Sequence, residues 1–263
     1  MDNWPIGVFD SGVGGLSILI ELQKLLPNEN FVFLADQAYL PYGEKSSIQL
    51  INRCTDITDY FIKKHHIKMM IVACNTATAS TINALRKKYS LPIVGTIPAL
   101  KPAAQHTASG IIAVLSTPST SKSLTLKKLI KDNCKGVNVL NIGCKGLASV
   151  VEGDIGIMDG KQLLEKYLQK VKNSKADYLV LGCTQYPFLK KTIQKIVGSH
   201  VKLLDSGKAI AKYTKSLLIA KNITNKEKRH RKTLYFTTGN AVKFSRVATK
   251  LLKHKIQTKK IRV

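Results

Sequence analysis

Two cysteines of this chain stand in matched sequence surroundings, 109 positions apart. Cys74 and Cys183 each follow a short apolar run and one small residue, and each is followed by hydroxyl or amide side chains. At a helix N-terminus, oriented N–H groups and the helix dipole stabilise a thiolate. A nucleophilic cysteine would need a histidine partner, and neither motif has one nearby. Two thiols on opposite sides of a carbon atom could instead remove a proton from one face and deliver one to the other, which inverts that centre by general acid–base catalysis.

Two carboxylates are the best acidic candidates for such a site. Asp10 directly follows an apolar run, and Glu152 lies in the apolar, flexible segment 150–153. Near a thiol or an ammonium group, either carboxylate could relay a proton or hold charge. Isolated cysteines are usually small core hydrophobes, and we expect that role for the three that lack the strand-end setting, Cys54, Cys134 and Cys144.

A glycine-rich loop after the first apolar run approaches a dinucleotide-binding fingerprint. Residues 12–17 nearly match the pattern G-x-G-x-x-G/A, and Asp36 ends the next apolar run, where a ribose-binding acid would stand. Two features count against a dinucleotide: the third glycine position holds Ser17, and Asp10 would repel a pyrophosphate. The same helix N-terminus, with the hydroxyl of Ser11, could equally receive a carboxylate.

Short apolar runs alternate with helix-like segments along the chain. The runs are rich in β-branched residues and predict buried strands at 6–9, 31–34, 69–72, 92–94, 111–115, 137–140, 178–181, 201–204 and 234–236. Apolar residues at helical spacing predict helices in segments that include 17–26, 46–65, 78–89, 161–173 and 188–197. Such alternation gives mostly parallel sheets covered on both faces, with active sites outside the carboxyl ends of the strands.

The repeated cysteine motif predicts two pseudo-symmetric α/β domains with mostly parallel sheets and an active site in the cleft between them. The first domain is expected to comprise residues 1–98 and 208–263, and the second residues 99–207. Asp10 and Cys74 would then belong to the first domain, and Glu152 and Cys183 to the second. Exposed loops near 96–102 and 206–208 are the expected crossovers.

The composition is that of a folded protein with a large positive charge. There are 42 Lys+Arg and 16 Asp+Glu, a net charge of +26, but the hydrophobic fraction of 44% excludes a disordered chain. The sequence contains no uninterrupted run of about 18 apolar residues, so we predict no membrane span. The first residues carry no export signal, so we expect a cytoplasmic protein. Five cysteines, without C-x-x-C pairs or zinc spacing, argue against a disulfide framework and against a metal site.

The C-terminal part is the most basic. From Lys208 onward there are 17 Lys+Arg and one acid, Glu227, and the run 226–232 is almost entirely basic. Such a segment could bind nucleic acid. No nucleic-acid-binding motif accompanies it, and a solvated lysine-rich face or the steering of an anionic substrate would explain the same composition.

Taken together, these motifs resemble those of bacterial glutamate racemases, members of the cofactor-independent aspartate/glutamate racemase family. The resemblance covers essentially the whole chain, in order and at suitable spacing, and is carried by residues 10–15, Asp36 with 41–43, 73–77, 151–153, 182–187 and 238–240. It implies interconversion of L- and D-glutamate without pyridoxal phosphate, another cofactor or a metal, supplying D-glutamate for the peptidoglycan cell wall. Members of this family are often dimers, so the resemblance implies a homodimer, and the lack of a long apolar run predicts no membrane partner.

The resemblance also implies residue roles. Cys74 and Cys183 would be the two acid/base residues, with Asp10 as a further catalytic group and Glu152 assisting Cys183. Substrate contacts would come from Asp10, Ser11, Tyr42, Gly43, Asn75, Thr76, Thr184 and Gln185.

One position departs from the family pattern. Relatives commonly have histidine two residues after the second cysteine, where this chain has Gln185, and a carboxamide does not take or give a proton near neutral pH. The departure keeps two alternatives open. The chain could racemise another acidic amino acid such as aspartate, or it could be a degenerate racemase whose basic part binds nucleic acid or a protein partner. Asn240, where acid is common, is expected to be a structural difference.

Overall fold

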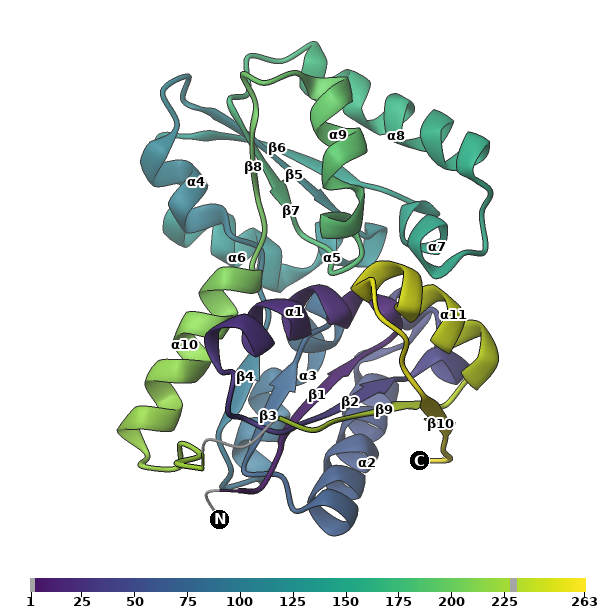
Figure 1. Cartoon of the computed structure of the whole chain (residues 1–263). Coiled ribbons are helices and arrows are strands. Elements are labelled where there is room, and N and C mark those ends of the chain that lie inside the picture. Colours follow the sequence, from purple (N-terminus) through teal and green to yellow (C-terminus); the bar gives the residue numbers. More distant parts are fainter. Residues whose placement is uncertain (1–2, 228–230) are drawn as a thin grey trace. The chain divides into compact units, whose positions relative to one another are not determined.

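The computed structural model describes residues 3–227 and 231–263, which form two compact units (Figure 1). The first unit contains the residues up to Thr96 and those from Gly207 onward, and the second is Ile97–Ser206. Part of the basic run 226–232, namely 228–230, lies outside the described residues. Within the described ranges, no helix is long and apolar enough to cross a membrane.

The first unit is built on a six-stranded parallel sheet in the order β10-β9-β2-β1-β3-β4. Its strands are β1 (Ile6–Asp10), β2 (Phe31–Ala35), β3 (Met69–Val72), β4 (Ile93–Gly95), β9 (Thr233–Thr237) and β10 (Thr258–Lys260). Its helices are α1 (Leu16–Leu25), α2 (Ser47–His65), α3 (Asn75–Lys88), α10 (Gly207–Ala220) and α11 (Ala241–Leu252), with short 3-10 turns η1 (Val13–Gly15), η2 (Gln37–Tyr39) and η3 (Tyr42–Glu44).

Helices cover both faces of this sheet, with α1 and α11 in front of it and α2 and α3 behind it in Figure 1. Alternate residues of a strand serve the two faces. Val32 and Leu34 of β2 belong to the core under α2 and α3, whereas Phe33 stacks on Phe244 of α11 with ring centroids 6.1 Å apart. Helix α10 packs against α1. Strands buried on both faces explain why the sequence shows continuous apolar runs rather than alternation.

Helix α2 shows how local sequence sets these elements. Ser46 and Gln49 form a capping box at its start, in which each side chain accepts the other residue's backbone N–H. The helix ends at His65, and the next residue, His66, adopts a left-handed conformation with φ of 49°. Apolar residues three and four positions apart place one stripe against the sheet, namely Leu50, Cys54, Ile57 and Phe61.

The second unit is a four-stranded parallel sheet in the order β6-β5-β7-β8. Its strands are β5 (Ile111–Ser116), β6 (Asn138–Gly143), β7 (Tyr178–Leu181) and β8 (Lys202–Leu204). Its helices are α4 (Leu100–His106), α5 (Pro118–Lys122), α6 (Leu124–Asn133), α7 (Leu147–Glu152), α8 (Ile157–Lys172) and α9 (Lys190–Val197), and the 3-10 helix η4 (Tyr186–Leu189) precedes α9. Residues of α4 and α6 cover one face, and residues of α7, α8 and α9 cover the other.

The expected fold class, two α/β units with parallel sheets, is confirmed. All nine predicted strands are present, and β10 (Thr258–Lys260) is an additional edge strand. The expectation that all nine are buried was wrong for β6 and β8, which lie at the edges of the four-stranded sheet and are largely half-buried or exposed. The crossovers, expected to be exposed, are exposed only in part: Ile97, Lys101 and Lys208 are exposed, whereas Thr96, Leu100 and Ser206 are buried. Their polar groups are bonded locally, because the Thr96 N–H donates to the Val72 carbonyl and Ser206 Oγ donates to the Ile97 carbonyl at 2.5 Å.

A buried ion pair connects three segments of the first unit. Lys68 Nζ lies 2.6 Å from Glu29 Oε2, and both side chains are at most 2% exposed. Glu29 Oε1 also accepts the Asn225 N–H at 2.8 Å. Glu29 lies between α1 and β2, Lys68 precedes β3 and Asn225 lies between α10 and β9, so this contact fixes the approach to three strands.

We predict that E29Q lowers the free energy of unfolding by about 3 kcal/mol, because Lys68 keeps its buried charge and loses its anionic partner. Urea denaturation followed by circular dichroism measures this change. E21Q is the matched control, since Glu21 pairs with Lys24 at the surface and such pairs contribute about 1 kcal/mol or less. Equal losses in the two variants would contradict the assignment.

Candidate active site

Polar side chains gather at the carboxyl edge of the six-stranded sheet. Because its strands are parallel, the residues at or just beyond their carboxyl ends lie along one edge. From β9 to β4 these are Thr238, Asp36, Asp10, Cys74 and Thr96, each at most 7% exposed. The sequence candidates Asp10 and Cys74 therefore follow neighbouring strands, β1 and β3.

Cys74 caps the N-terminus of α3. The Ala77 N–H donates to Cys74 Sγ at 3.5 Å, and Ser11 Oγ lies 3.6 Å from the same sulfur. Burial, and after it the negative charge of Asp10, raises the pKa of the Cys74 thiol to about 12, against the lowering effect of the hydrogen bonds from Ala77 and Ser11. Without a cation beside it, this sulfur stays protonated at neutral pH, so a cationic substrate group would be needed to favour its thiolate.

Asp10 organises the glycine-rich loop. Its Oδ1 accepts the Gly12 N–H at 2.9 Å and the Ser11 hydroxyl at 3.3 Å. A Cβ on Gly15 would lie 2.6 Å from the Asp10 Cβ and 3.3 Å from the Ala73 Cβ, so glycine is needed for this close approach. Because the carboxylate occupies the loop, a dinucleotide phosphate would meet a negative charge there.

Two buried polar atoms near Cys74 have open hydrogen-bonding capacity. Asn75 Oδ1 and Thr96 Oγ1 have no hydrogen-bond partner among the described residues. A buried acceptor without a partner costs about 1–3 kcal/mol, so these atoms suit a ligand that supplies a donor. Thr96 was missed by the sequence reasoning, although its place two residues after an apolar run was an available signal. Thr76, beside Asn75, is also buried.

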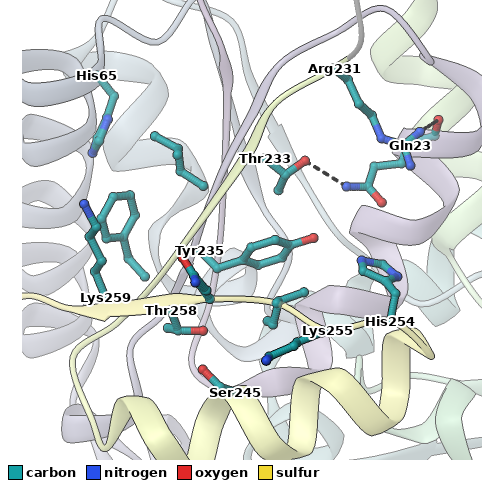
Figure 2. A pocket seen from close by; sticks show the side chains of 14 residues that line it. Gln23, His65, Arg231, Thr233, Tyr235, Ser245, His254, Lys255, Thr258 and Lys259 are labelled. Carbon is teal, nitrogen blue, oxygen red and sulfur yellow. Dashed lines mark hydrogen bonds between the residues drawn. The ribbon is translucent and has the colours of Figure 1, made fainter.

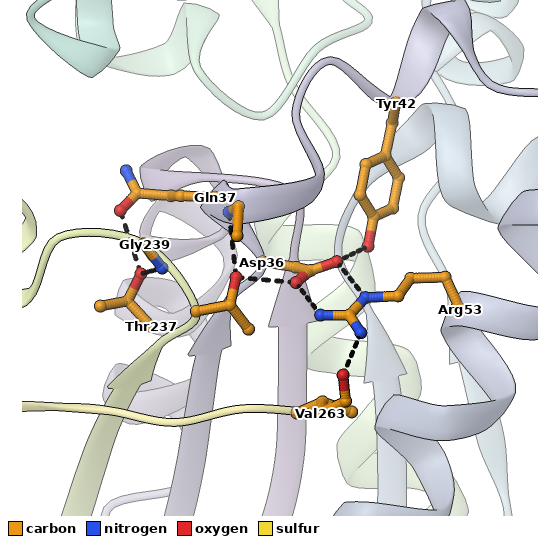
Figure 3. A network of polar contacts seen from close by, with 9 residues as sticks. Asp36, Gln37, Tyr42, Arg53, Thr237, Gly239 and Val263 are labelled. Carbon is orange, nitrogen blue, oxygen red and sulfur yellow. Dashed lines mark hydrogen bonds and ion pairs between the residues drawn. The ribbon is translucent and has the colours of Figure 1, made fainter.

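Asp36 is the centre of a saturated polar network (Figure 3). Its two oxygens receive Nε and Nη2 of Arg53 at 2.8 and 2.6 Å, the Tyr42 hydroxyl at 2.7 Å and the Thr238 hydroxyl at 2.8 Å. Arg53 also donates to the Val263 carbonyl. Four donors on one fully buried carboxylate leave little capacity for a ribose, so Asp36 has a structural role.

This network limits how Tyr42, one of the predicted substrate-binding residues, can contact a ligand. The Tyr42 hydroxyl is held by Asp36, and burial, then the Asp36 charge, raises the Tyr42 pKa well above its usual value. Gly43 is exposed. Arg53, which the sequence reasoning missed, lies in the middle of α2, where no local signal distinguishes it from a solvent-exposed arginine.

In the second unit, Cys183 follows β7 after a required glycine. A Cβ on Gly182 would lie 2.9 Å from the Leu115 carbonyl oxygen and 3.3 Å from the Ser116 Cβ. The Gly182 N–H donates to that carbonyl at 2.7 Å, which holds the turn against β5. Cys183 is 6% exposed, so this sulfur, like Cys74, sits in a largely dry environment.

Three side chains form a hydrogen-bonded chain at Cys183. Gln185 Oε1 lies 3.0 Å from Cys183 Sγ and accepts the Thr184 hydroxyl at 3.2 Å. Gln185 Nε2 donates to Glu152 Oε1 at 3.0 Å. Glu152 is the last residue of α7 and is 4% exposed. A carboxylate at the negative end of a helix is electrostatically unfavourable, which points to a functional reason for its place.

A cavity in the first unit lies away from these residues (Figure 2). It has a volume of about 980 Å³ and is lined by the exposed cations Arg231, Lys255 and Lys259 among others. Gln23 donates to Thr233 in its wall at 3.0 Å. None of the sequence-predicted site residues lines this cavity. In the part of the chain that the structure describes, no group of three or more His, Cys, Asp or Glu side chains could hold a metal ion.

The comparisons with known proteins agree with this arrangement. A sequence profile described as Asp/Glu/Hydantoin racemase matches residues 21–214. Glutamate racemase from Aliarcobacter butzleri is 44% identical over 216 residues, which are 81% of this chain and 83% of that protein. The chain belongs to the Asp/Glu/hydantoin racemase family.

Solved structures give the same answer for the fold. The RacE1 isoform of glutamate racemase from Bacillus anthracis matches with a TM-score of 0.88 and 30% identity, over 100% of this chain and 99% of that one. Escherichia coli glutamate racemase, solved with L-glutamate and the activator UDP-MurNAc-Ala, matches with a TM-score of 0.86 and 30% identity, over 97% of both chains.

The two neighbours of Cys74 that shift its pKa in opposite directions can be tested by two substitutions with opposite expected effects. We predict that D10N accelerates alkylation of Cys74 by iodoacetamide at mildly alkaline pH, because the Asp10 charge raises the thiol pKa. S11A should slow the same reaction, because the Ser11 hydrogen bond lowers that pKa. Mass spectrometry of the Cys74 peptide measures both rates. Changes in the same direction would show that accessibility, not charge, controls the reaction.

Proposed function

We propose that this chain interconverts L- and D-glutamate by moving a proton at the α-carbon between Cys74 and Cys183. The observation that carries the proposal is the pair of buried thiols, each separated from the end of a parallel strand by one small residue. One thiol removes the α-proton as a thiolate while the other donates a proton to the opposite face. The enantiomers have equal free energy, so each thiol must serve in both roles.

The first unit supplies groups suited to the amino-acid end of the substrate. Asn75 Oδ1 is an open acceptor, and an ammonium group has three donors. An ammonium beside Cys74 would also oppose the effects of burial and of Asp10 on this thiol. Ser11 and Thr76 would contact a substrate carboxylate through their hydroxyls, next to the N-terminus of α3. Tyr42 and Gly43 would contribute through their backbone turn η3.

The second unit supplies the partner thiol and its supporting groups. Thr184 would bind a substrate carboxylate beside Cys183, at the carboxyl end of β7. Glu152 would assist Cys183, and Gln185 lies between them. Because both sulfurs are nearly dry, a carbanion next to a carboxylate would meet little competing water, which strengthens each electrostatic contact.

We further propose the biological setting. The reaction would proceed without a cofactor or metal, in the cytoplasm, and would supply D-glutamate for peptidoglycan synthesis. The protein would act as a homodimer, with domains divided at 98/99 and 207/208. An anionic substrate is attracted by a chain of net charge +26, which gives the basic surface a role without nucleic acid.

Racemisation of aspartate is the second candidate activity, and Gln185 is the observation that favours it. Replacement of the usual histidine changes the hydrogen bonding at Cys183, one of the two atoms that would handle the proton. The two substrates differ by one methylene, a difference that typically changes specificity by about 10- to 200-fold.

We predict that C74A and C183A each reduce racemisation at least about 1,000-fold, since each removes one positioned acid/base group. Circular dichroism should show an unchanged fold. C134A is the matched control, because Cys134 is also buried but lies at the end of α6, and its activity should be unchanged. Near-normal turnover in either active-site variant would rule out the two-thiol mechanism.

Heavy water distinguishes the substrates and tests the cofactor proposal. Incubation with L-glutamate should produce D-glutamate with deuterium at the α-carbon, measured by polarimetry and NMR, and L-aspartate should react more slowly. Dialysis against a chelator should leave the rate unchanged. A rate lost on dialysis and restored by a divalent metal or pyridoxal phosphate would contradict cofactor independence, and faster aspartate turnover would establish the second candidate.

A further inference from the structure

Gln185 joins the second thiol to a carboxylate through a carboxamide whose orientation is fixed. Its Nε2 donates to Glu152 Oε1, and its Oε1 faces Cys183 Sγ and the Thr184 hydroxyl. An ionised carboxylate only accepts hydrogen bonds, so it must face the NH₂ group. The carbonyl oxygen must then face the sulfur, and the two ends of the amide cannot be exchanged while Glu152 is charged.

A carbonyl oxygen accepts hydrogen bonds and cannot donate them, so its bond to Cys183 requires a proton on the sulfur. We propose that Gln185 is a positioning residue that holds Cys183 in its protonated thiol form, and that Glu152 enforces this form by fixing the carboxamide. The role of this thiol in catalysis rests on the proposed function. In that reaction, Cys183 of the substrate-free protein would already carry the proton that it donates to the substrate.

The same geometry opposes the thiolate. When the S–H bond of Cys183 breaks and its proton forms the new C–H bond of the substrate, the sulfur is left negatively charged against Gln185 Oε1. Turning the carboxamide would bring its NH₂ to the sulfur, but would place Oε1 against the Glu152 carboxylate. The turn is favourable only when Glu152 is protonated or replaced by a neutral side chain. Negative charge on Glu152 and on Cys183 therefore oppose each other.

Two further titratable groups of this region, Tyr186 and Cys144, keep their protons through the neutral range. Tyr186 in η4 interacts with both Cys183 and Cys144, and its pKa is raised well above the usual value, mainly by burial. Burial raises the pKa of the Cys144 thiol to about 12. Glu152, from α7, is thus the charged neighbour that an experiment must change.

The experiment is a double-mutant cycle on the full chain, using E152Q, Q185M and the double variant. E152Q is isosteric and neutral, and Q185M keeps side-chain length but removes the carboxamide. The measured quantity is the pH at half-maximal alkylation of Cys183 by iodoacetamide, resolved by mass spectrometry of its peptide. E165Q is the matched control, since Glu165 is an exposed acid of α8 that faces Lys161.

We expect E152Q to lower this midpoint by about one pH unit, because the freed carboxamide can turn its N–H groups to the thiolate. In the Q185M background the same change should lower it by less than about half as much. E165Q should leave the midpoint unchanged. Equal shifts in both backgrounds would overturn the proposal, because Glu152 would then act by charge alone and not through Gln185.

Q185H provides a second variant if Q185M does not fold. An imidazole can accept the thiol proton while still donating to Glu152, so the midpoint should fall with Glu152 intact, and kcat/KM should rise equally for both enantiomers. An unchanged midpoint would contradict the inference. Alkylation of Cys183 does not require turnover of a substrate. The alkylation test of Gln185 and the racemisation test of the proposed function can therefore give opposite results, and failure of one is distinguishable from failure of the other.

Discussion

Burial of a thiol at the end of a parallel strand is the constraint on which the rest of the candidate site depends. A dry sulfur resists ionisation, so each thiol needs local hydrogen bonds that select its charge state. The close packing that creates this dry environment requires very small residues. A Cβ at Gly15 would strike Asp10, and a Cβ at Gly182 would strike the Leu115 carbonyl. Gly15 and Gly182 are thus required by the close packing at the strand ends that carry Asp10 and Cys183.

The two sulfurs are treated differently by their surroundings. Cys74 accepts an N–H from Ala77 at a helix N-terminus, which lowers the pKa of this thiol, although burial and the Asp10 charge raise that pKa by more. Cys183 donates to a carbonyl oxygen, an arrangement that favours the proton. A reaction that takes a proton on one face and gives one on the other needs one thiol and one thiolate at the start of each turnover. In the proposed reaction, the local hydrogen bonds would therefore favour Cys74 over Cys183 as the thiolate once a cationic substrate group is bound, although the overall equilibrium between enantiomers cannot be changed.

The sequence was sufficient for the features that depend on local pattern. Continuous apolar runs identified the strands, and both cysteines could be placed because each follows such a run after one small residue. The sequence alone did not predict the contacts between residues far apart in the chain. Arg53 is an ordinary helical arginine until the fold brings Asp36 beside it, and β10 is a polar Thr-Lys-Lys segment that becomes a strand by pairing with β9. The bridging role of Gln185 required Glu152, 33 residues earlier in the chain, to be positioned by α7.

Hydrogen-bond saturation separates the structural polar groups of this site from the functional ones. Asp36 receives four donors from the protein, so its burial cost is offset within the fold and it can fix the turn that carries Tyr42. Asn75 Oδ1 is equally enclosed but has no partner among the described residues, so the cost of burying it is offset only when a donor arrives. Glu152 stands between these cases, because it is bonded to Gln185 but lies at the unfavourable end of its helix. Stability alone would favour a neutral side chain there. In the inference proposed above, the charge of Glu152 acts instead on the orientation of Gln185 and, through that carboxamide, on the proton of Cys183.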